Sequence, residues 1–339
     1  MNILVTGGCG GIGTSLIPIL QSLGHYVVII DNLRNGYSDN LKNFDTDKYI
    51  FYNQDICDEN SVTDIMLNHN VNVVIHLAAI TSLMDCELNK VECLTTNVIG
   101  TQVLLECSRK LGIKKFIFAS TSAVYENTPI EMSPFSENSI VSPRLLYSTS
   151  KLMSENLVLS YIENYSLNAV ILRFFNVISH NQDFFRKSPP ILNYLVRCHI
   201  RNETPILHSD GEQRRNYISI DDIVNFIKII IDSNTNDKIF NLCSSKLYSV
   251  NELVKLINEE FSIELNPTYR SSDLLWGSES PLFNNPNPLK REIITKETNK
   301  FSLGDNSLPK TLGWSPNQDM DSVIKKTARK IFELHKPIN

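Results

Sequence analysis

A tyrosine and a lysine stand four positions apart in the stretch Tyr147-Ser148-Thr149-Ser150-Lys151. On a helix this spacing places both side chains on one face, one turn apart. A tyrosine hydroxyl has an unperturbed pKa of about 10, so it acts as a base near neutral pH only when a nearby cation favours the phenolate. Lys151 supplies such a cation. Taken alone the pattern is weak, because Tyr and Lys also share ordinary exposed helix faces.

A glycine-rich segment follows the first apolar run. Ile3-Leu4-Val5 leads into Thr6-Gly7-Gly8-Cys9-Gly10-Gly11-Ile12-Gly13, and a helical pattern comes next. Glycines here allow a tight turn and let a pyrophosphate approach the backbone at a helix N-terminus. A strand before and a helix after are the context that the dinucleotide-binding fingerprint requires. The residues expected to bind the cofactor in this loop are Gly7, Gly10, Gly11, Ile12 and Gly13.

An acidic residue ends the second apolar run. Asp31 lies 18 residues after Gly13, close to the spacing of about 20 expected for the carboxylate that binds the adenosine ribose. A carboxylate at this place repels the additional phosphate of NADP, and the next residue, Asn32, is not basic. Arg34 is near enough to leave NADP as an alternative. We expect Asp31 and Asn32 to bind NAD.

Short apolar runs alternate with helical patterns through the first half of the chain. Continuous apolar runs are typical of strands buried on both faces, and their alternation with helices predicts a parallel sheet. The expected fold is α/β: a Rossmann-type doubly wound parallel sheet with a smaller C-terminal α/β substrate domain. We place the NAD-binding domain at residues 1–173 and the substrate domain at 174–339, with some segments of the latter returning to the former. The expected helices include Gly13–Leu23, Val91–Leu111 and Lys151–Tyr165, and residues 271–288 are expected to form a long loop.

Composition narrows the range of partners. The chain has 339 residues and a formal net charge of -5, which gives no support to nucleic acid or an anionic membrane as a partner. Its seven cysteines are odd in number and irregularly spaced, which favours reduced thiols. No basic leader precedes the first strand. These features predict a cytoplasmic protein without a metal site.

Taken together, these motifs and several later ones resemble the extended short-chain dehydrogenase/reductase family, in its NAD-dependent sugar-nucleotide epimerase/dehydratase branch. The later matching segments are Asp55-Ile56, His76-Leu77-Ala78-Ala79, Asn97 within Asn97-Val98-Ile99-Gly100-Thr101, Ser120-Thr121-Ser122-Ala123-Val124-Tyr125, Leu172-Arg173-Phe174-Phe175-Asn176-Val177, Gly211-Glu212-Gln213-Arg214-Arg215-Asn216-Tyr217 with Asp221-Asp222, and Leu312-Gly313-Trp314. They follow the family order and cover nearly the whole chain.

The resemblance implies a role for each matched residue. Thr121 is expected to bind the sugar hydroxyl and share its proton with Tyr147, with Ser122 and then Ser120 as rivals, while Lys151 also holds the nicotinamide ribose. Further cofactor-binding residues are Asp55, Ile56, Leu77, Ala78, Ala79, Asn97 and Phe175. The implied substrate-binding residues are Thr121, Ser122, Tyr147, Asn176, Arg215 and Ser302.

Two adjacent positions separate the branches of the family. Its dehydratases carry Asp-Glu directly after the catalytic Thr, because elimination of water needs an additional acid and base. This chain has Ser122-Ala123 instead. The difference favours an epimerase that acts at C4 of a UDP-hexose or UDP-N-acetylhexosamine through a transient 4-keto sugar. The alternatives are a net oxidoreductase on a nucleotide sugar and a non-catalytic NAD-binding regulator.

The chain also departs from the family near its C-terminus. The late Arg-x-Gly-Asp block that grips the diphosphate is missing just before Asp305. Either Arg270-Ser271-Ser272-Asp273, which keeps the end residues of the block, is separated from Asp305 by an inserted loop, or one of Lys290, Arg291 and Lys296 takes the role. Ser302 aligns with the position that borders the C2 substituent of the sugar, where a small residue admits an N-acetyl group. By resemblance we also expect a homodimer, formed through the helix after Glu92 and the helix that carries Tyr147.

Overall fold

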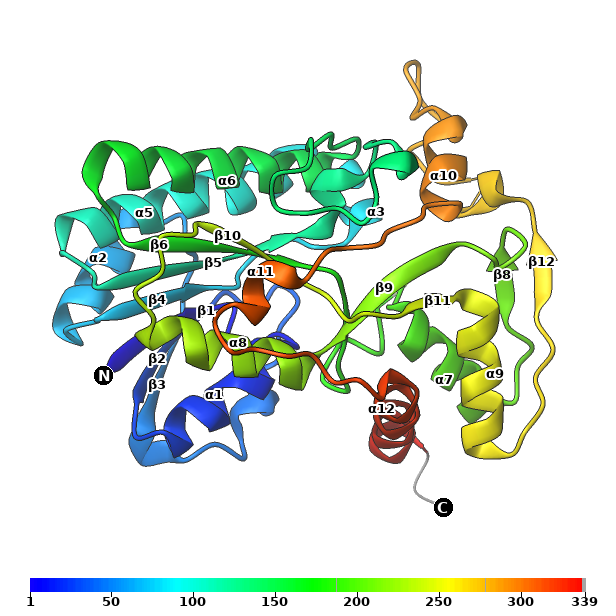
Figure 1. Cartoon of the computed structure of the whole chain (residues 1–339), viewed down its shortest axis with the longest axis horizontal. Coiled ribbons are helices and arrows are strands. Elements are labelled where there is room, and N and C mark those ends of the chain that lie inside the picture. Colours follow the sequence, from blue (N-terminus) through cyan, green and yellow to red (C-terminus); the bar gives the residue numbers. More distant parts are fainter. Residues whose placement is uncertain (187, 278, 337–339) are drawn as a thin grey trace.

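A parallel sheet forms the centre of the computed structural model, which describes residues 1–186, 188–277 and 279–336 (Figure 1). Its seven strands lie in the order β10-β6-β5-β4-β1-β2-β3, and every pair is parallel. The strands are β1 (Asn2–Thr6), β2 (Tyr26–Asp31), β3 (Tyr49–Asn53), β4 (Val73–His76), β5 (Lys115–Thr121), β6 (Ala169–Phe174) and β10 (Ile239–Leu242). Most of their side chains are buried, as the continuous apolar runs predict.

Helices cover both faces of this sheet. On one face α1 (Gly13–Ser22) packs with α8 (Ile220–Asp232), and Leu16, Ile227 and Trp314 belong to that core. The other face is covered by α2 (Glu59–Asn68), α5 (Gly100–Lys110) and α6 (Leu146–Tyr165), whose buried residues include Leu104 and Val158 (Figure 1). The predicted Rossmann-type α/β fold is therefore confirmed.

The second half of the chain contributes to both parts of the molecule. Strand β10 and helix α8 complete the large sheet, and the remaining elements form a smaller body with its own apolar core. That body contains β7 (Asn176–Ile178), α7 (Ile191–Arg201), β8 (Ile206–His208), β9 (Arg214–Ser219), β11 (Leu247–Ser249), α9 (Val250–Phe261), β12 (Thr268–Arg270) and α12 (Met320–His335). The boundary between residues 173 and 174 stays a prediction.

Several local elements differ from the expected ones. The helix predicted at Val91–Leu111 consists of α4 (Lys90–Leu94), a π-helical turn at Thr95–Ile99 and α5. Helix α6 begins at Leu146, one turn before Lys151. Residues 271–288 are largely irregular, apart from a 3-10 turn at Ser272–Leu274 and residue 278, which lies outside the described residues.

Three short helices complete the chain: α3 (Leu83–Leu88), α10 (Arg291–Thr298) and α11 (Ser307–Lys310). Helix α3 follows the central strand β4, and α10 follows the irregular segment after β12 (Figure 1). Within the ranges given above, no helix combines the length and the apolar character needed to cross a bilayer.

Candidate active site

A cleft of about 1430 Å³ lies at the carboxyl ends of the sheet strands, where open α/β sheets bind their ligands. Most of the sequence-predicted site residues line it: Gly7, Gly10, Gly11, Ile12, Gly13, Asp31, Asn32, Ile56, Leu77, Ala78, Ala79, Thr121, Tyr147, Lys151, Phe175 and Asn176. The others lie outside its lining: Asp55, Asn97, Ser122, Arg215 and Ser302. Most of the expected cofactor residues are thus brought together, whereas two of them, Asp55 and Asn97, and part of the expected substrate set lie elsewhere.

The glycine loop is shaped by close backbone approaches. Gly7 has φ +69°, and a Cβ added there would lie 2.7 Å from the backbone N of Ala78. A Cβ at Gly13 would lie 2.5 Å from the Gly8 carbonyl oxygen. Side chains at either position would separate β1 from α1 or from the loop after β4. The loop therefore leaves backbone N–H groups at the start of α1 facing the cleft, and this cradle fits a dinucleotide pyrophosphate.

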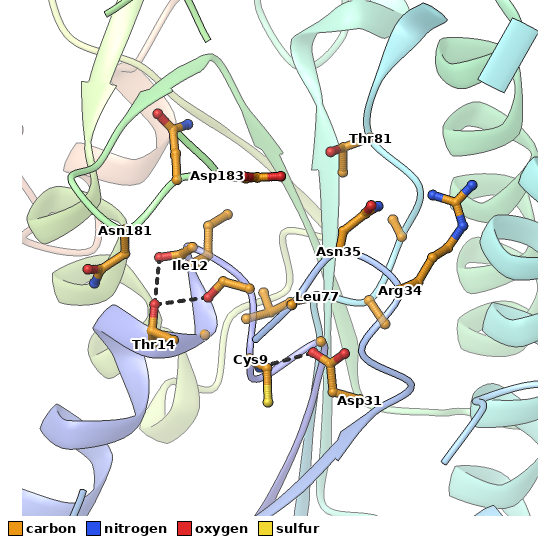
Figure 2. A pocket seen from close by; sticks show the side chains of 18 of the residues that line it. Cys9, Ile12, Thr14, Asp31, Arg34, Asn35, Leu77, Thr81, Asn181 and Asp183 are labelled. Carbon is orange, nitrogen blue, oxygen red and sulfur yellow. Dashed lines mark hydrogen bonds between the residues drawn. The ribbon is translucent and has the colours of Figure 1, made fainter. Parts of the chain in front are cut away.

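Asp31 is fixed at the adenosine end of the cleft. Its Oδ2 accepts a hydrogen bond from the Cys9 N–H at 3.0 Å (Figure 2). Its Oδ1 accepts one from the Leu33 N–H at 2.8 Å. Burial raises the pKa of Asp31, and these two backbone hydrogen bonds oppose the rise. Its position and rigidity suit recognition of a ribose diol.

Arg34 was the reason for keeping NADP as an alternative cofactor, but its side chain pairs with two carboxylates of this chain. Its guanidinium pairs with Asp85 at 2.7 Å and with Glu92 at 2.6 Å. Figure 2 shows its side chain directed away from Asp31. A ribose phosphate would have to compete with two carboxylates for this cation, which favours NAD(H). The preference over NADP(H) stays a prediction.

Two elements bring the proposed catalytic groups to one wall of the cleft. Thr121 ends β5, and Tyr147 and Lys151 project from the first turns of α6. Burial raises the pKa of Tyr147, and the hydroxyl of Thr121 partly offsets that rise. Burial lowers the pKa of Lys151 to about 8, while Glu155, one turn further along α6, acts in the opposite direction. The lysine Nζ lies 4.5 Å from the centre of the Phe118 ring.

We expect Lys151→Met to stabilise the cofactor-free protein by about 1–3 kcal/mol at pH 7, since one pKa unit corresponds to about 1.4 kcal/mol. The pKa of Lys151 is about 8 in the folded protein, below its ordinary value of 10.5. Below pH 8 the buried lysine is charged, and the full cost of burying that charge lowers the stability of the folded protein. This penalty disappears as the pH rises towards 10.5. Urea unfolding of wild type and variant at pH 7 and pH 10 measures it; a stability difference that is the same at both pH values would contradict the expectation.

Asn97 lies behind the cleft wall, where it joins two elements. Its Oδ1 accepts a hydrogen bond from the Ile80 N–H at 2.8 Å, and its Nδ2 donates to the Ser150 Oγ at 2.9 Å. The π-helical turn around it gives the side chain this orientation. Asn97 therefore holds the loop after β4 against the helix that carries Tyr147 and Lys151.

Arg215 and Ser302 are neighbours, although 87 positions separate them in the sequence. An isolated parallel bridge pairs the two residues, and the Asn216 N–H donates to the Ser302 carbonyl at 2.8 Å. Ser302 is buried. The Arg215 guanidinium donates to the backbone carbonyl of Glu297 at 2.8 Å and lies 3.6 Å from its carboxylate. The structure thus joins two residues that the sequence assigned to the substrate.

A charged cluster that the sequence analysis missed surrounds this pair. Glu297 pairs with Arg144 at 3.2 Å and with Lys300 at 3.7 Å, in addition to Arg215. Burial acts to raise the pKa of Glu297, but these three cations lower it overall. Lys300 also lies 3.7 Å from Glu126, so three basic side chains share two carboxylates in this cluster. Arginine and lysine side chains of this kind also bind phosphate groups.

The three basic candidates for the missing Arg-x-Gly-Asp block do not join this cluster. Arg291 donates to the Asp273 carbonyl at 2.7 Å and stacks on Phe283, and Lys290 and Lys296 are exposed. The face of helix α10 that carries Glu297 is buried instead. Glu297 of this helix reaches Arg215, and Lys300, just after the helix, contacts the same carboxylate.

A family model described as "NAD dependent epimerase/dehydratase family" matches residues 3–243, which is well over half of the chain. The chain belongs to this family. NAD is therefore its cofactor, and the glycine loop and Asp31 fit that molecule as described above. The family assignment agrees with the resemblance found in the sequence.

Individual family members have different activities. The chain is 29% identical to a putative UDP-glucose 4-epimerase of Methanocaldococcus jannaschii, over 96% of each chain. It is 28% identical to the dTDP-D-glucose 4,6-dehydratase of Mus musculus, over 96% of this chain and 87% of the other. A solved UDP-glucose 4-epimerase of Thermotoga maritima, with UDP-glucose, matches with a TM-score of 0.86 and 30% identity over 98% of this chain and 99% of the other. Sequence and fold similarity of this kind identifies the family. The reaction has to be inferred from the residues of the site.

Proposed function

We propose that the protein epimerises C4 of a UDP-hexose or a UDP-N-acetylhexosamine through a transient 4-keto sugar. The observation that carries the proposal is the wall formed by Thr121, Tyr147 and Lys151, which has Ser122 and Ala123 where a dehydratase needs an acid and a base. The UDP-glucose 4-epimerase with a TM-score of 0.86 supports the same choice.

The side chains of this wall have separate tasks in the proposed reaction. Bound NAD supplies the means of oxidising the C4 alcohol to a ketone and of reversing that oxidation. Tyr147 removes the proton from the C4 hydroxyl and returns it, and Thr121 holds the same oxygen. Lys151 keeps the phenolate accessible by its charge. Return of hydrogen to the opposite face of the ketone inverts C4.

Glu126 is the carboxylate that follows soonest after Thr121 in the sequence, and its contacts argue against a dehydratase. Its Oε2 accepts hydrogen bonds from the Leu145 N–H at 3.2 Å and from the Ser148 hydroxyl at 2.6 Å. It thereby caps the start of α6 rather than facing the sugar. A proton relay for eliminating water has no evident acid along this part of β5 and the turn after it.

Ser302 aligns with the position that borders the C2 substituent of the sugar, and its small side chain extends the proposal to N-acetylhexosamines. Ser302 is adjacent to Arg215 through the backbone bridge. If Arg215 binds the diphosphate, a serine beside it leaves space for an acetamido group. The proposal therefore includes both UDP-hexoses and UDP-N-acetylhexosamines.

A panel of sugar nucleotides tests the reaction directly. UDP-glucose, UDP-galactose, UDP-N-acetylglucosamine and dTDP-glucose are each incubated with the protein, and the products are followed by NMR. The proposal expects the C4 stereoisomer of a UDP-sugar and no lasting change in nicotinamide absorbance. A 4-keto-6-deoxy product would establish a dehydratase, and stoichiometric NADH formation would establish a net oxidoreductase.

Arg215→Ala is expected to raise KM for the UDP-sugar by about 10–100-fold with a much smaller change in kcat, because a charge-assisted contact to the diphosphate contributes to ground-state and transition-state binding alike. Arg214→Ala is the matched control, since Arg214 is partly exposed and pairs with Glu252 at 3.3 Å. Initial rates over a range of substrate concentrations measure both. A large KM effect in Arg214→Ala alone would move the diphosphate contact by one residue.

We also propose a homodimer formed through α4, the π-helical turn and α6. Large apolar side chains on these elements are exposed in the single chain: Val91 at 80%, Ile99 at 52% and Met153 at 44%. Pairing of these surfaces in a second copy would remove them from water. Light scattering at micromolar concentration should give twice the mass of the chain.

A reducing compartment such as the cytoplasm is consistent with the thiols. All seven cysteines are free, and six of them are buried. Burial raises the pKa of Cys9 and of Cys57 to about 12, which keeps these thiols protonated and unreactive. We therefore propose a cytoplasmic location.

A further inference from the structure

A segment of the smaller body, residues 180–186, lies across the glycine loop. A Cβ added to Gly11 would be 3.0 Å from the Asn181 carbonyl oxygen and 3.2 Å from the Gln182 Cα. The Asn181 side chain donates to the Ser15 hydroxyl of α1 at 3.0 Å. We call residues 180–186 the strap, because they span the cleft from β7 over the turn that opens α1.

Contacts with two other parts of the chain hold the strap in place. Asp183 accepts a hydrogen bond from the Tyr37 hydroxyl, in the loop after β2, at 3.5 Å. The Phe184 ring stacks on His335 at the end of α12, with ring centres 4.0 Å apart and planes at 10°. In Figure 2 Asp183 points across the cleft towards Thr81. The strap therefore begins against the glycine loop at Asn181 and Gln182, and from Asp183 onward it forms a separate wall of the cleft.

Arg186 brings a positive charge to this wall. It lines the cleft, and its Nε donates to the Ser188 carbonyl, a neutral acceptor, at 2.6 Å. Burial lowers the pKa of Arg186, and Asp183 and Asp85 oppose that effect. Asp85 is already paired with Arg34, and Asp183 accepts hydrogen bonds from the backbone N–H groups of Phe185 and Arg186 itself.

A guanidinium in this position has the shape and charge for a phosphate. Its Nε is used by Ser188, which fixes the plane of the group and leaves the terminal NH₂ groups as donors. Water solvates it incompletely, so an anion that enters the cleft gains more from pairing with it than with an exposed arginine. The glycine loop on a separate wall is the pyrophosphate cradle of the fold.

We propose that Arg186 binds the pyrophosphate of NAD from a wall of the cleft separate from the glycine loop, and that the strap retains the cofactor in the cleft. The role concerns cofactor binding and does not depend on which nucleotide sugar the enzyme converts. The strap joins the smaller body to the cofactor, so each domain contributes to NAD affinity.

Binding measurements on protein stripped of NAD test the proposal. Arg186→Met should weaken NADH binding in calorimetry by about 10–100-fold, as loss of charge-assisted hydrogen bonds implies. Affinity for ADP-ribose should fall by the same factor, since it retains the pyrophosphate, and UDP affinity should stay within twofold. Arg186→Lys should recover part of the loss. Arg201→Met, at the exposed end of α7, is the control.

Two results would overturn the proposal. NADH affinity that stays within twofold while UDP affinity falls would assign Arg186 to the substrate diphosphate. Affinities for NADH and UDP that both stay within twofold would show that Arg186 binds neither phosphate group. Equal urea midpoints for wild type and Arg186→Met establish that the variant is folded, and a variant that fails this check is replaced by Arg186→Gln, for which the same outcomes apply.

Discussion

Replacing Tyr147 with phenylalanine is expected to lower kcat by about 10²–10⁴-fold, the usual contribution of a positioned general base. The substitution removes only the hydroxyl, and the ring keeps its place on the cleft wall beside Thr121. NADH affinity should therefore change little, while KM for the sugar nucleotide changes less than kcat. Initial-rate kinetics and calorimetry with NADH measure the two effects.

Tyr165→Phe is the matched control for that experiment. Tyr165 is the last residue of the same helix, and 55% of it is exposed. Loss of its hydroxyl should leave kcat within about twofold, because surface substitutions away from special features have small effects. Tyr147→Phe with nearly normal turnover would show that another group removes the proton from the substrate.

The cofactor half of the site could be predicted because its residues belong to contiguous local patterns. The glycine loop, Asp31 and the pair Tyr147 and Lys151 each follow from a strand or helix whose period is visible in the sequence. The parallel sheet then brings the ends of separate strands to one edge. Local structure and topology together were sufficient to place these residues in one cleft.

The substrate half could not be predicted in the same way. The contact of Arg144 with Glu297 spans 153 positions and depends on how α10 is oriented after an irregular segment. Helical periodicity predicts which residues share a face, but not which way that face turns when the flanking loop has no fixed conformation. For this reason Lys290, Arg291 and Lys296 were chosen as candidates, while Glu297 and Lys300 belong to the cluster around Arg215.

Arg186 was missed for a related reason. It lies in an irregular segment between β7 and α7, where no helical or strand period is visible in the sequence. Its place follows from contacts that other residues of the strap make with Gly11, Tyr37 and His335, each in a different part of the chain. The position of Arg186 is therefore defined only when both domains have packed against each other.

The largest effect on stability is expected from the buried ion pair behind the catalytic wall. Arg173 of β6 and Glu155 of α6 pair at 2.7 Å, and their side chains are 4% and 1% exposed. The Ser120 hydroxyl also donates to Glu155, and the Tyr125 hydroxyl accepts from Arg173 at 2.6 Å. Removing one partner leaves the other charge buried without compensation, which typically costs about 3–5 kcal/mol.

Glu155→Leu and Arg173→Met should therefore each lower the free energy of unfolding by about 3–5 kcal/mol. The double variant should be more stable than either single one, because no unpaired charge remains in an apolar site. Urea titrations of the three variants and wild type form the double-mutant cycle. Glu259→Leu is the surface control, since Glu259 pairs with Lys325 where both side chains are partly exposed, and its cost should stay below about 1 kcal/mol.

The ion pair of Arg173 and Glu155 affects both the stability of the catalytic wall and the protonation of Lys151. Glu155 lies one turn from Lys151 and holds the pKa of that lysine above the value that burial alone would give. In Glu155→Leu the pKa of Lys151 should fall below about 8, so activity on the basic side of the pH profile should be lost at a lower pH than in wild type. Arg173→Met keeps the carboxylate and should not cause that shift. Equal pH profiles in the two variants, or additive costs in the cycle, would show that the two charges act independently.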